Sequence, residues 1–443
     1  MKKIAVLGIA RSGLSAALKA RELGYQVFIS EYKKLEDCDV TLQELAGLDY
    51  EFGGHSDKLY DFPQIIVSPG IPLTTPIIKK LQANGNELIS EIEFGFRIKH
   101  PATKIIAVTG SNGKSTTVSL IYHILNELHI KVALAGNIGI AFTSLPIEKY
   151  AYDYVVLELS SFQLDLVYDF RPDIAVLLNI TPDHLNRYES FEHYSLAKFN
   201  IFKEQTETDT AIIFDKDRQI NSYIHLIPSK IRRFSLKERS DVKLDNTNLS
   251  TSRLLIDISK TSLKGEHNIL NIMATMLVLE SLPMTLDSEL TAKAFTSFKG
   301  LAHRLEFVAD INGVTFVNDS KATNTDSVKY ALSAFKQRVR IIMGGSDKGE
   351  DFGILLEHLN IYAKKLYLIG ETKAKMMKQF EEFTPKETFD NLEEAVKKAF
   401  TESHPNDIII LSPACASYDA YKNYEHRGDS FRMIVENLKN NEQ

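Results

Sequence analysis

A glycine-rich stretch between a predicted strand and a predicted helix constrains the fold of this chain more than any other feature. The apolar run at residues 105–108 predicts a β-strand, and Thr109-Gly-Ser-Asn-Gly-Lys-Ser-Thr116 then leads into an amphipathic helix that begins near Lys114. Such a turn presents successive backbone N–H groups at a helix N-terminus, where they can bind polyphosphate. The stretch therefore predicts an α/β domain built around a nucleotide-binding loop.

The residues of this loop suit different parts of a bound polyphosphate. Lys114 would supply a full positive charge, and the Ser115 hydroxyl is a suitable ligand for Mg²⁺. The candidate phosphate-binding residues are Gly110, Ser111, Asn112, Gly113, Lys114, Ser115 and Thr116. The spacing departs from the standard Walker A pattern, because Val108 stands where a glycine is expected. A glycine-rich turn with an incidental lysine is therefore the alternative interpretation.

Chain length and the repeated alternation of strands and helices predict three α/β domains. We expect a Rossmann-like N-terminal domain at residues 1–92, a central P-loop mononucleotide-binding domain at 93–297 and a Rossmann-like C-terminal domain at 298–443. The net charge of −6 argues against a nucleic-acid or anionic-membrane surface, and no apolar run is long enough to span a bilayer. Cys38 and Cys415 are too few for a disulfide framework or a zinc site, which favours a cytoplasmic location.

The first domain opens with a pattern similar to a dinucleotide-binding fingerprint. Gly8-Ile-Ala-Arg-Ser-Gly13 occupies the first strand-to-helix turn, and Glu31 ends the second strand, where a ribose-binding acid belongs. Ala10 replaces the middle glycine, and its methyl group hinders approach to a pyrophosphate. NAD binding is therefore disfavoured, whereas another nucleotide remains open. The strands are expected at residues 3–7, 27–30 and 65–67, with a helix at 12–23.

Polar side chains follow the predicted strands of the central domain. Asn137 lies in a turn after one strand, Glu158 ends the next, and His184 follows a third. Because the C-terminal ends of parallel strands share the edge that carries the P-loop, Glu158 and His184 can reach Mg²⁺ there. The alternatives are a solvated Glu158, a helix cap formed by Asp183 and His184, and an exposed helix lysine at Lys198. These strands are expected at residues 131–135, 154–158, 174–178 and 211–214, with a helical run at 191–202.

Three polar loops follow the predicted strands of the third domain. A hairpin around Asn312-Gly313 joins strands at residues 307–310 and 314–318, and further strands are expected at 340–343 and 407–411. The loops are Asn318-Asp-Ser-Lys-Ala-Thr-Asn324, Gly344-Gly-Ser-Asp-Lys-Gly349 and Ser412-Pro-Ala-Cys-Ala-Ser417. Upstream, residues 206–262 are interpreted as a sheet edge or connection without assigned chemistry. Gly265-Glu-His-Asn268 opens a helix whose start can contact a base or a phosphate.

Taken in order, these motifs resemble those of the Mur ligases, the ATP-dependent enzymes that add amino acids to the peptidoglycan precursor. The resemblance covers essentially the whole chain. The pattern common to the family is matched by Thr109-Gly-Ser-Asn-Gly-Lys-Ser-Thr116, Glu158, His184, Gly265-Glu-His-Asn268, His303-Arg304 and Asn318-Asp-Ser-Lys321. Ser412-Pro-Ala-Cys-Ala-Ser-Tyr-Asp419, Tyr424-Glu-His-Arg-Gly428 and Phe431 are similar to the branch that adds D-glutamate.

The resemblance implies an ATP-dependent acid–amino-acid ligase that serves peptidoglycan synthesis, and with it cell-wall biogenesis, cell shape and cell division. ATP would phosphorylate the carboxylate of UDP-N-acetylmuramoyl-L-alanine, and the amine of D-glutamate would attack the acyl phosphate. Two Mg²⁺ ions would offset the repulsion among these anions. A monomer without nucleic-acid or membrane partners is expected.

The resemblance also implies a role for each site residue. Catalysis would fall to Lys114, Glu158, His184 and Lys198, with one Mg²⁺ on Ser115 and Glu158 and the other on His184 and a Lys198 carbamylated by CO₂. ATP would contact Asn268, Arg304, Asp319 and Lys321 as well as the P-loop, and Asn137 and His184 would touch the acyl donor. D-Glutamate would be held by Thr323, Lys348, Ser417, Tyr418 and Tyr424, and the uridine nucleotide by Arg11, Ser12, Glu31, Tyr32, Lys33 and Gly70.

Four other functions stay open at this point. A Mur ligase with another amino acid is the nearest, followed by a folylpolyglutamate-synthase-like ligase, which would lack the uridine-binding first domain. A P-loop regulatory module without ligase activity does not explain why three polar loops follow the strands of the third domain. A nicotinamide-dependent oxidoreductase conflicts with the methyl group of Ala10.

Overall fold

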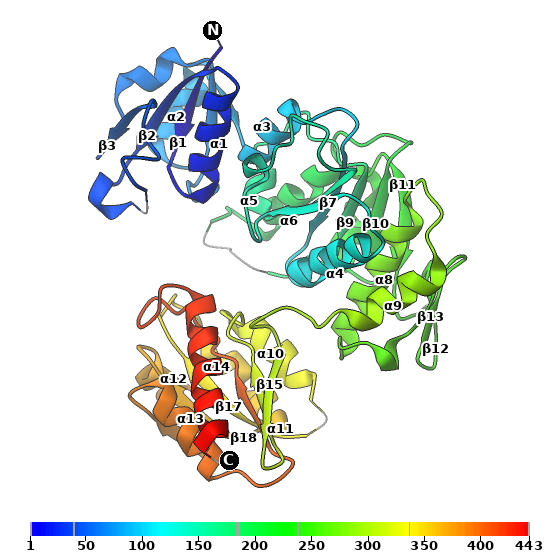
Figure 1. Cartoon of the computed structure of the whole chain (residues 1–443). Coiled ribbons are helices and arrows are strands. Elements are labelled where there is room, and N and C mark those ends of the chain that lie inside the picture. The colour runs from blue at the N-terminus through cyan, green and yellow to red at the C-terminus, as the bar shows by residue number, and fades with distance from the viewer. Residues whose placement is uncertain are drawn as a thin grey trace. The chain divides into compact units, whose positions relative to one another are not determined.

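The computed structural model describes residues 2–38, 40–182, 187–237, 239–335, 337–383 and 385–441. The chain forms two compact units, the first of Met1–Thr261 with Ile269–Phe298 and the second of Ser262–Asn268 with Lys299–Gln443 (Figure 1). The first unit holds two parallel sheets and a small antiparallel one, and the second unit holds one mixed sheet, so the predicted α/β fold is confirmed. The division into three domains at residues 92/93 and 297/298 stays a prediction.

The first sheet contains five parallel strands in the order β3-β2-β1-β4-β5. Apolar residues of β1, such as Ile4 and Val6, are fully buried, because parallel strands are covered by helices on both faces. The strands and helix predicted in this region are confirmed. The elements are β1 (Lys3–Leu7), α1 (Arg11–Glu22), β2 (Gln26–Glu31), β3 (Asp49–Phe52), β4 (Gln64–Val67), α2 (Pro76–Ala83), β5 (Glu87–Ile89) and α3 (Glu91–Ile98).

The second sheet contains six parallel strands in the order β11-β10-β9-β6-β8-β7. Strand β6 lies between β8 and β9, so three strand ends meet at the edge that carries the glycine-rich loop. Its strands are β6 (Lys104–Thr109), β7 (Val132–Gly136), β8 (Tyr154–Glu158), β9 (Ile174–Leu177), β10 (Thr210–Phe214) and β11 (Lys230–Phe234). The helices are α4 (Lys114–Glu127), α5 (Ser161–Leu164), α6 (Phe191–Phe199), α7 (Arg218–Ser222), α8 (Glu266–Glu280) and α9 (Ser288–Ser297).

Residues 206–262 combine a sheet edge with a small separate sheet. The edge strand β11 agrees with the interpretation of this region as a sheet edge. Beyond it, β12 (Lys243–Asp245), β13 (Asn248–Ser250) and β14 (Leu255–Asp257) form an antiparallel sheet that the sequence did not predict. Each of these strands has only three residues, which is too short for a visible alternation of apolar and polar side chains.

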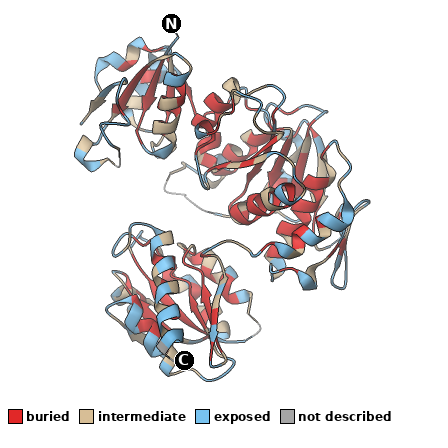
Figure 2. Cartoon of the chain, in the orientation of Figure 1, coloured by how far each residue is buried: buried red, intermediate tan, exposed pale blue. Residues whose placement is uncertain are grey.

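The sheet of the second unit has the order β15-β16-β20-β17-β18-β19, in which only the β15–β16 pair is antiparallel. The predicted hairpin is confirmed, and its turn residues Asn312 and Gly313 both have positive φ. The four central strands β16, β20, β17 and β18 are mostly buried, whereas the outer faces of α13 and α14 are exposed (Figure 2). The strands are β15 (Glu306–Ile311), β16 (Val314–Asn318), β17 (Val339–Gly344), β18 (Ala363–Ile369), β19 (Lys386–Thr388) and β20 (Ile408–Leu411). The helices are α10 (Thr325–Ser333), α11 (Leu356–Tyr362), α12 (Lys373–Gln379), α13 (Leu392–Thr401) and α14 (Tyr424–Asn441).

Across the described ranges, every helix is too short or too polar to cross a membrane.

Candidate active site

The glycine-rich loop joins β6 to α4 as predicted. Gly110 has φ 150° and Gly113 has φ 88°, conformations that L side chains rarely adopt. An added Cβ at Gly113 would also lie 2.5 Å from Oδ1 of Asn271 in α8. The loop therefore needs glycine at residue 113 for both its conformation and its packing, and it presents its backbone at the start of α4, where anions bind.

Asn179, which follows β9, fixes the conformation of the loop. Its Oδ1 accepts a hydrogen bond from Asn112 N at 2.8 Å, and its Nδ2 donates to Asn112 O at 3.0 Å. The Ser111 hydroxyl lies 2.9 Å from the buried Tyr194 hydroxyl and donates to Thr181 O. No role was predicted for Asn179 or Tyr194, although the position of Asn179 directly after a buried strand was a usable signal.

Two lysine ammonium groups donate hydrogen bonds to the carbonyl oxygen of Gly110. Lys114 Nζ donates to Gly110 O at 2.7 Å and to Ser111 O at 2.8 Å. Lys198 Nζ donates to Gly110 O at 3.0 Å and lies 4.6 Å from the centroid of the Tyr194 ring. The Lys198 side chain is only 2% exposed, so the alternative of an exposed helix lysine is wrong. Both lysines lie where they can act on a phosphate bound by the loop.

Glu158 ends β8 beside the loop and is 2% exposed. Its Oε1 accepts a hydrogen bond from Asn137 Nδ2 at 2.8 Å, whereas its Oε2 is buried without a hydrogen-bond partner among the described residues. The alternative of a solvated carboxylate is therefore wrong. A buried carboxylate oxygen with unused lone pairs is costly unless it binds a cation or a donor. This oxygen and the buried Ser115 hydroxyl are hard ligands of the kind Mg²⁺ prefers.

The metal site cannot be completed from protein residues in the described ranges, which hold no group of three or more His, Cys, Asp or Glu side chains suited to a metal ion. His184, predicted as a ligand, and its neighbour Asp183 lie outside the described residues.

The predicted uridine contacts surround the C-terminal edge of the first sheet. Arg11, the first residue of α1, donates to Gly139 O at 2.7 Å and to Asn137 O at 3.3 Å, which brings two predicted substrate residues together. The oxygens of Glu31 accept hydrogen bonds from Ile9 N and Lys33 N, each at 2.9 Å. Glu31 thus orders the turn around it. Ser12 is half-buried, whereas Tyr32, Lys33 and Gly70 are exposed.

Asp319, which directly follows β16, is the most buried of the polar groups predicted to bind ATP in the second unit. Its Oδ2 accepts a hydrogen bond from the Ser412 hydroxyl at 2.8 Å, and its Oδ1 accepts one from Leu305 N at 3.2 Å. Burial raises the pKa of Asp319 to about 7, although these hydrogen bonds and the charge of the half-buried Arg304 oppose that shift. Asn268 Nδ2 donates to Lys264 O at 2.8 Å at the start of α8.

The predicted D-glutamate residues lie on loops that contact one another. Thr323 N donates to Lys321 O at 2.9 Å, and Lys321 Nζ lies 5.4 Å from the centroid of the Tyr424 ring. The loops that hold Lys348 and Ser417 are joined by an antiparallel bridge between Ser346 and Ala416. Ser417 is buried, whereas Lys348 and Tyr418 are exposed. No role was predicted for Arg427, which is buried beneath these loops.

Three family models match the chain along its length. The MurD N-terminal domain matches residues 3–77, the Mur ligase middle domain matches residues 108–279, and the glutamate ligase domain of Mur ligases matches residues 303–415. Together these three matches extend from the first sheet to the sheet of the second unit.

Named relatives match over nearly the full length. A UDP-N-acetylmuramoylalanine–D-glutamate ligase of Cytophaga hutchinsonii is 41% identical over 446 residues, which cover 98% of each chain. A protein of the same name from Bacteroides fragilis is 38% identical over 449 residues, covering 99% of this chain and 100% of that one.

Two solved structures show a similar fold at low sequence identity. The UDP-N-acetylmuramate-alanine ligase MurC of Thermotoga maritima aligns with a TM-score of 0.61 and 19% identity, covering 99% of this chain and 100% of that chain. FolC of E. coli in complex with ADP aligns with a TM-score of 0.60 and 15% identity, covering 78% of this chain and 93% of that chain.

Proposed function

The chain belongs to the Mur ligase family, and we propose that it uses ATP to join D-glutamate to UDP-N-acetylmuramoyl-L-alanine during the synthesis of the peptidoglycan precursor. Relatives of that name share up to 41% of their residues with it over 98% of its length. The chain is accordingly an ATP-dependent acid–amino-acid ligase. Within the structure, the observation that supports this reaction most is the buried Oε2 of Glu158, which has no hydrogen-bond partner among the described residues and lies beside the glycine-rich loop.

The residues of the first unit support phosphoryl transfer. We propose that Lys114 and the backbone of residues 110–116 hold the phosphates of ATP, while Ser115 and Glu158 bind one Mg²⁺. Mg²⁺ would supply neutralisation of the phosphate charge and alignment of the transferred group. The second metal would lie on His184 and a carbamylated Lys198, and Lys198 is already buried beside Gly110. Arg11, Asn137 and the edge of the first sheet would hold the UDP-linked carboxylate substrate.

The residues of the second unit support nucleotide and amino-acid binding. Asn268, Arg304, Asp319 and Lys321 would contact ATP, and Thr323, Lys348, Ser417, Tyr418 and Tyr424 would hold D-glutamate. A lysine supplies a charge for a carboxylate, while hydroxyl groups fix its orientation. The amine of D-glutamate would then attack the acyl phosphate to give the amide and inorganic phosphate.

The other functions lose support. A folylpolyglutamate-synthase-like ligase does not account for residues 3–77, which match the MurD N-terminal domain. A nicotinamide-dependent oxidoreductase is disfavoured by Ala10, whose methyl group stands where the fingerprint needs its middle glycine. A Mur ligase with another amino acid remains the second candidate, because Lys348 and Tyr418, two of the residues proposed to select D-glutamate, are exposed.

Phosphate release by the purified protein tests the reaction and its specificity together. The assay contains ATP, Mg²⁺ and UDP-N-acetylmuramoyl-L-alanine, and it compares D-glutamate with L-glutamate, L-alanine, L-lysine and diaminopimelate. We expect turnover with D-glutamate alone. Turnover with a different amino acid would overturn the assignment of Lys348 and Ser417 while keeping the ligase, and no turnover with any would favour a P-loop module without ligase activity.

We further propose a monomer in the cytoplasm. ATP and UDP-linked sugars, the substrates of the proposed reaction, are cytoplasmic compounds, and all residues proposed for the site come from one chain. Light scattering of the purified protein with and without substrates checks the monomer, and a dimeric mass under assay conditions would contradict it.

A further inference from the structure

Arg427 lies in the first turns of α14 and is 1% exposed, yet it carries a full charge. Its Nε donates to the Ser320 hydroxyl at 3.0 Å and its Nη2 to Ser320 O at 2.8 Å. On the other side, Nη2 donates to Cys415 O at 3.0 Å and Nη1 to Ala416 O at 3.1 Å. The guanidinium therefore connects the loop after β16 with the loop after β20.

The acceptors of Arg427 are all neutral oxygens. No carboxylate of the described residues forms an ion pair with it, and burial lowers its pKa to about 10, so it remains protonated at neutral pH. A cation near a helix N-terminus is also disfavoured by the helix dipole. An arginine that only supported the fold would be expected to have a carboxylate partner in such a place.

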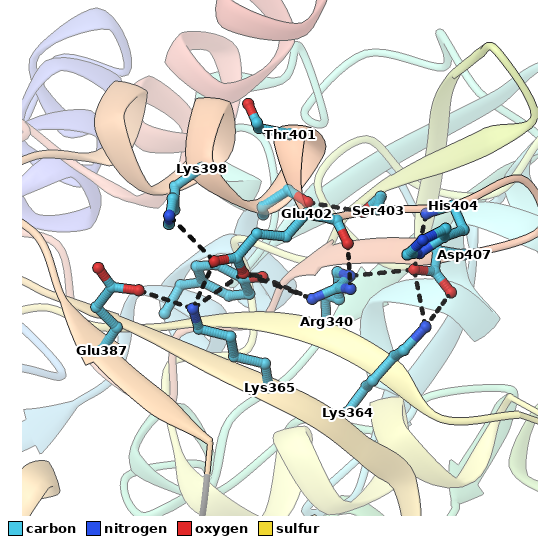
Figure 3. Close-up of polar contacts among 12 residues, drawn as sticks. Arg340, Lys364, Lys365, Glu387, Lys398, Thr401, Glu402, Ser403, His404 and Asp407 are labelled. Atoms are coloured by element: carbon cyan, nitrogen blue, oxygen red, sulfur yellow. Dashed lines mark hydrogen bonds and ion pairs between the residues drawn. The ribbon is translucent and has the colours of Figure 1, made fainter.

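Arg340 in the same unit shows that alternative arrangement (Figure 3). It is buried at the N-terminal end of β17, and its Nε donates to Asp407 Oδ2 at 3.1 Å. Its Nη1 donates to the Tyr367 hydroxyl at 2.9 Å and lies 3.7 Å from Glu402 Oε2. Arg340 is thus neutralised by carboxylates at the sheet edge opposite the predicted site, whereas Arg427 is not.

The loop after β17 also reaches Arg427. An added Cβ at Gly345 would lie 3.1 Å from Arg427 Nη1, and Ser346 N donates to Ala416 O at 3.0 Å. Arg427 consequently lies below three loops, which together hold the residues proposed for D-glutamate at positions 323, 348 and 417.

The nucleotide side of the same loops is held by other contacts. Asp319 is fixed by Ser412, by Leu305 N and by its own N–H donating to Leu411 O. None of these bonds involves Arg427. Asp319 therefore keeps these hydrogen bonds when Arg427 is lost, whereas Ser320 beside it loses its bonds to Arg427.

From these contacts we infer that Arg427 is a positioning residue for the amino-acid substrate, because it holds the Ser320 and Ala416 loops together. This inference rests on the proposed D-glutamate ligase function. Arg427 contacts the backbone of the site loops and acts through them.

Steady-state kinetics of R427K and R427Q in the full-length protein test this role. We expect R427Q to raise the KM for D-glutamate by about tenfold or more, as for the loss of charge-assisted hydrogen bonds. The KM for ATP should rise less than the KM for D-glutamate, because Asp319 keeps its bonds to Ser412, Leu305 and Leu411. R427K keeps the charge without the forked geometry and should restore part of the affinity.

R340Q is the matched control, since it also removes a buried arginine charge from the second unit. We expect it to lower the Tm at least as much as R427Q while leaving the KM for D-glutamate unchanged. The inference would be overturned by an unchanged KM for D-glutamate in R427Q, or by equal increases of that KM in R427Q and R340Q. If R427Q does not fold, the KM for D-glutamate of R427K is compared with that of R340Q under the same criteria. Failure of the wild-type protein to use D-glutamate would instead refute the proposed function.

Discussion

Glu158 and Glu91 are both buried glutamates with one oxygen unpartnered among the described residues, yet their surroundings differ. Glu91 Oε1 accepts hydrogen bonds from Thr143 N at 2.6 Å and from Thr143 Oγ1 at 2.8 Å, so it fixes the 3₁₀ helix η3 (Phe142–Ser144). Glu158 lies beside the phosphate-binding loop. The first carboxylate therefore has a structural role, whereas the second is available to a cation.

Glu158→Gln should separate function from stability. The amide keeps the shape but is a poorer Mg²⁺ ligand, so turnover should fall about 100-fold or more. The Tm without Mg²⁺ should stay unchanged or rise, since a buried charge is removed. Phosphate release over a range of Mg²⁺ concentrations measures the first effect and thermal unfolding the second. Glu91→Gln is the control and should keep wild-type Mg²⁺ dependence; wild-type turnover in Glu158→Gln would refute the metal role.

Glu91→Gln should change how stability depends on pH. Burial raises the pKa of Glu91 from 4.5 to about 7, so the folded state binds its proton more tightly than the unfolded state. Wild-type stability from this group is therefore present below about pH 4.5 and is lost as the pH rises to about 7. Above pH 7 the variant should be more stable by about 3 kcal/mol, and the difference should vanish below about pH 4.5. Urea unfolding at several pH values measures this.

The exposed Glu36→Gln provides the comparison for that series. Its side chain is 76% exposed, so its stability difference from wild type should stay within about 0.5 kcal/mol at every pH. A Glu91→Gln difference that is constant from pH 5 to pH 8 would show that Glu91 is ionised in the folded protein, contrary to the expectation.

The sequence did not show which of the charged side chains are buried. A lysine within a helical run is ordinarily exposed, but Lys198 is buried because α6 packs against the loop that its Nζ contacts. Arg427 stood within a motif that was noticed, yet its partners lie 11, 12 and 107 positions away. Such contacts depend on which strands become neighbours, and local patterns carry no information about that.

At the scale of elements, α14 packs closely against the turn before β15 because Gly428 has no side chain. A Cβ added to Gly428 would lie 2.1 Å from His303 Nδ1, and Gly428 O accepts a hydrogen bond from Asn318 Nδ2 at 3.1 Å. Gly428→Ala should push α14 away from this turn and destabilise the second unit by about 1 to 3 kcal/mol, despite the better helix propensity of alanine. The Tm and phosphate release should both fall.

Ser430→Ala in the same helix is the control for Gly428→Ala. It removes only the hydrogen bond from the Ser430 hydroxyl to His426 O, and it should change the Tm by no more than a degree or two. A Gly428→Ala variant with unchanged or higher Tm would mean that His303 moves aside without cost.

Elements with strong apolar patterns were predicted well, and short polar ones were not. β1 has the predicted bounds, and the predicted strand at residues 105–108 agrees with β6 (Lys104–Thr109) within a residue at each end. These strands are buried on both faces, so the apolar run itself defines them. The separate sheet of β12, β13 and β14 is largely exposed, and its three-residue strands depend on pairing with one another.

At the scale of the whole molecule, the chain has separate hydrophobic cores. The cores of the first unit include Ile105 and Val155, and those of the second include Ile341 and Phe316. The residues proposed for the site are divided in the same way, with the glycine-rich loop in the first unit and Asp319 and Ser417 in the second. A ligand or substitution that acts on one unit should therefore report on that unit's unfolding.

Scanning calorimetry should accordingly resolve two unfolding transitions, because each unit has its own core and two-state behaviour is not expected. Asp407→Asn should lower one of them, since Asp407 accepts from Arg340 Nε and from Lys364 Nζ in the second unit. Weakening these charge-assisted hydrogen bonds should cost about 1 to 3 kcal/mol. Mg²⁺ with ADP at 100 times its Kd should add about 2.7 kcal/mol, and both transitions should rise, because the proposed nucleotide contacts come from both units. A single transition that Asp407→Asn lowers as a whole would instead mean that the two units unfold as one cooperative body.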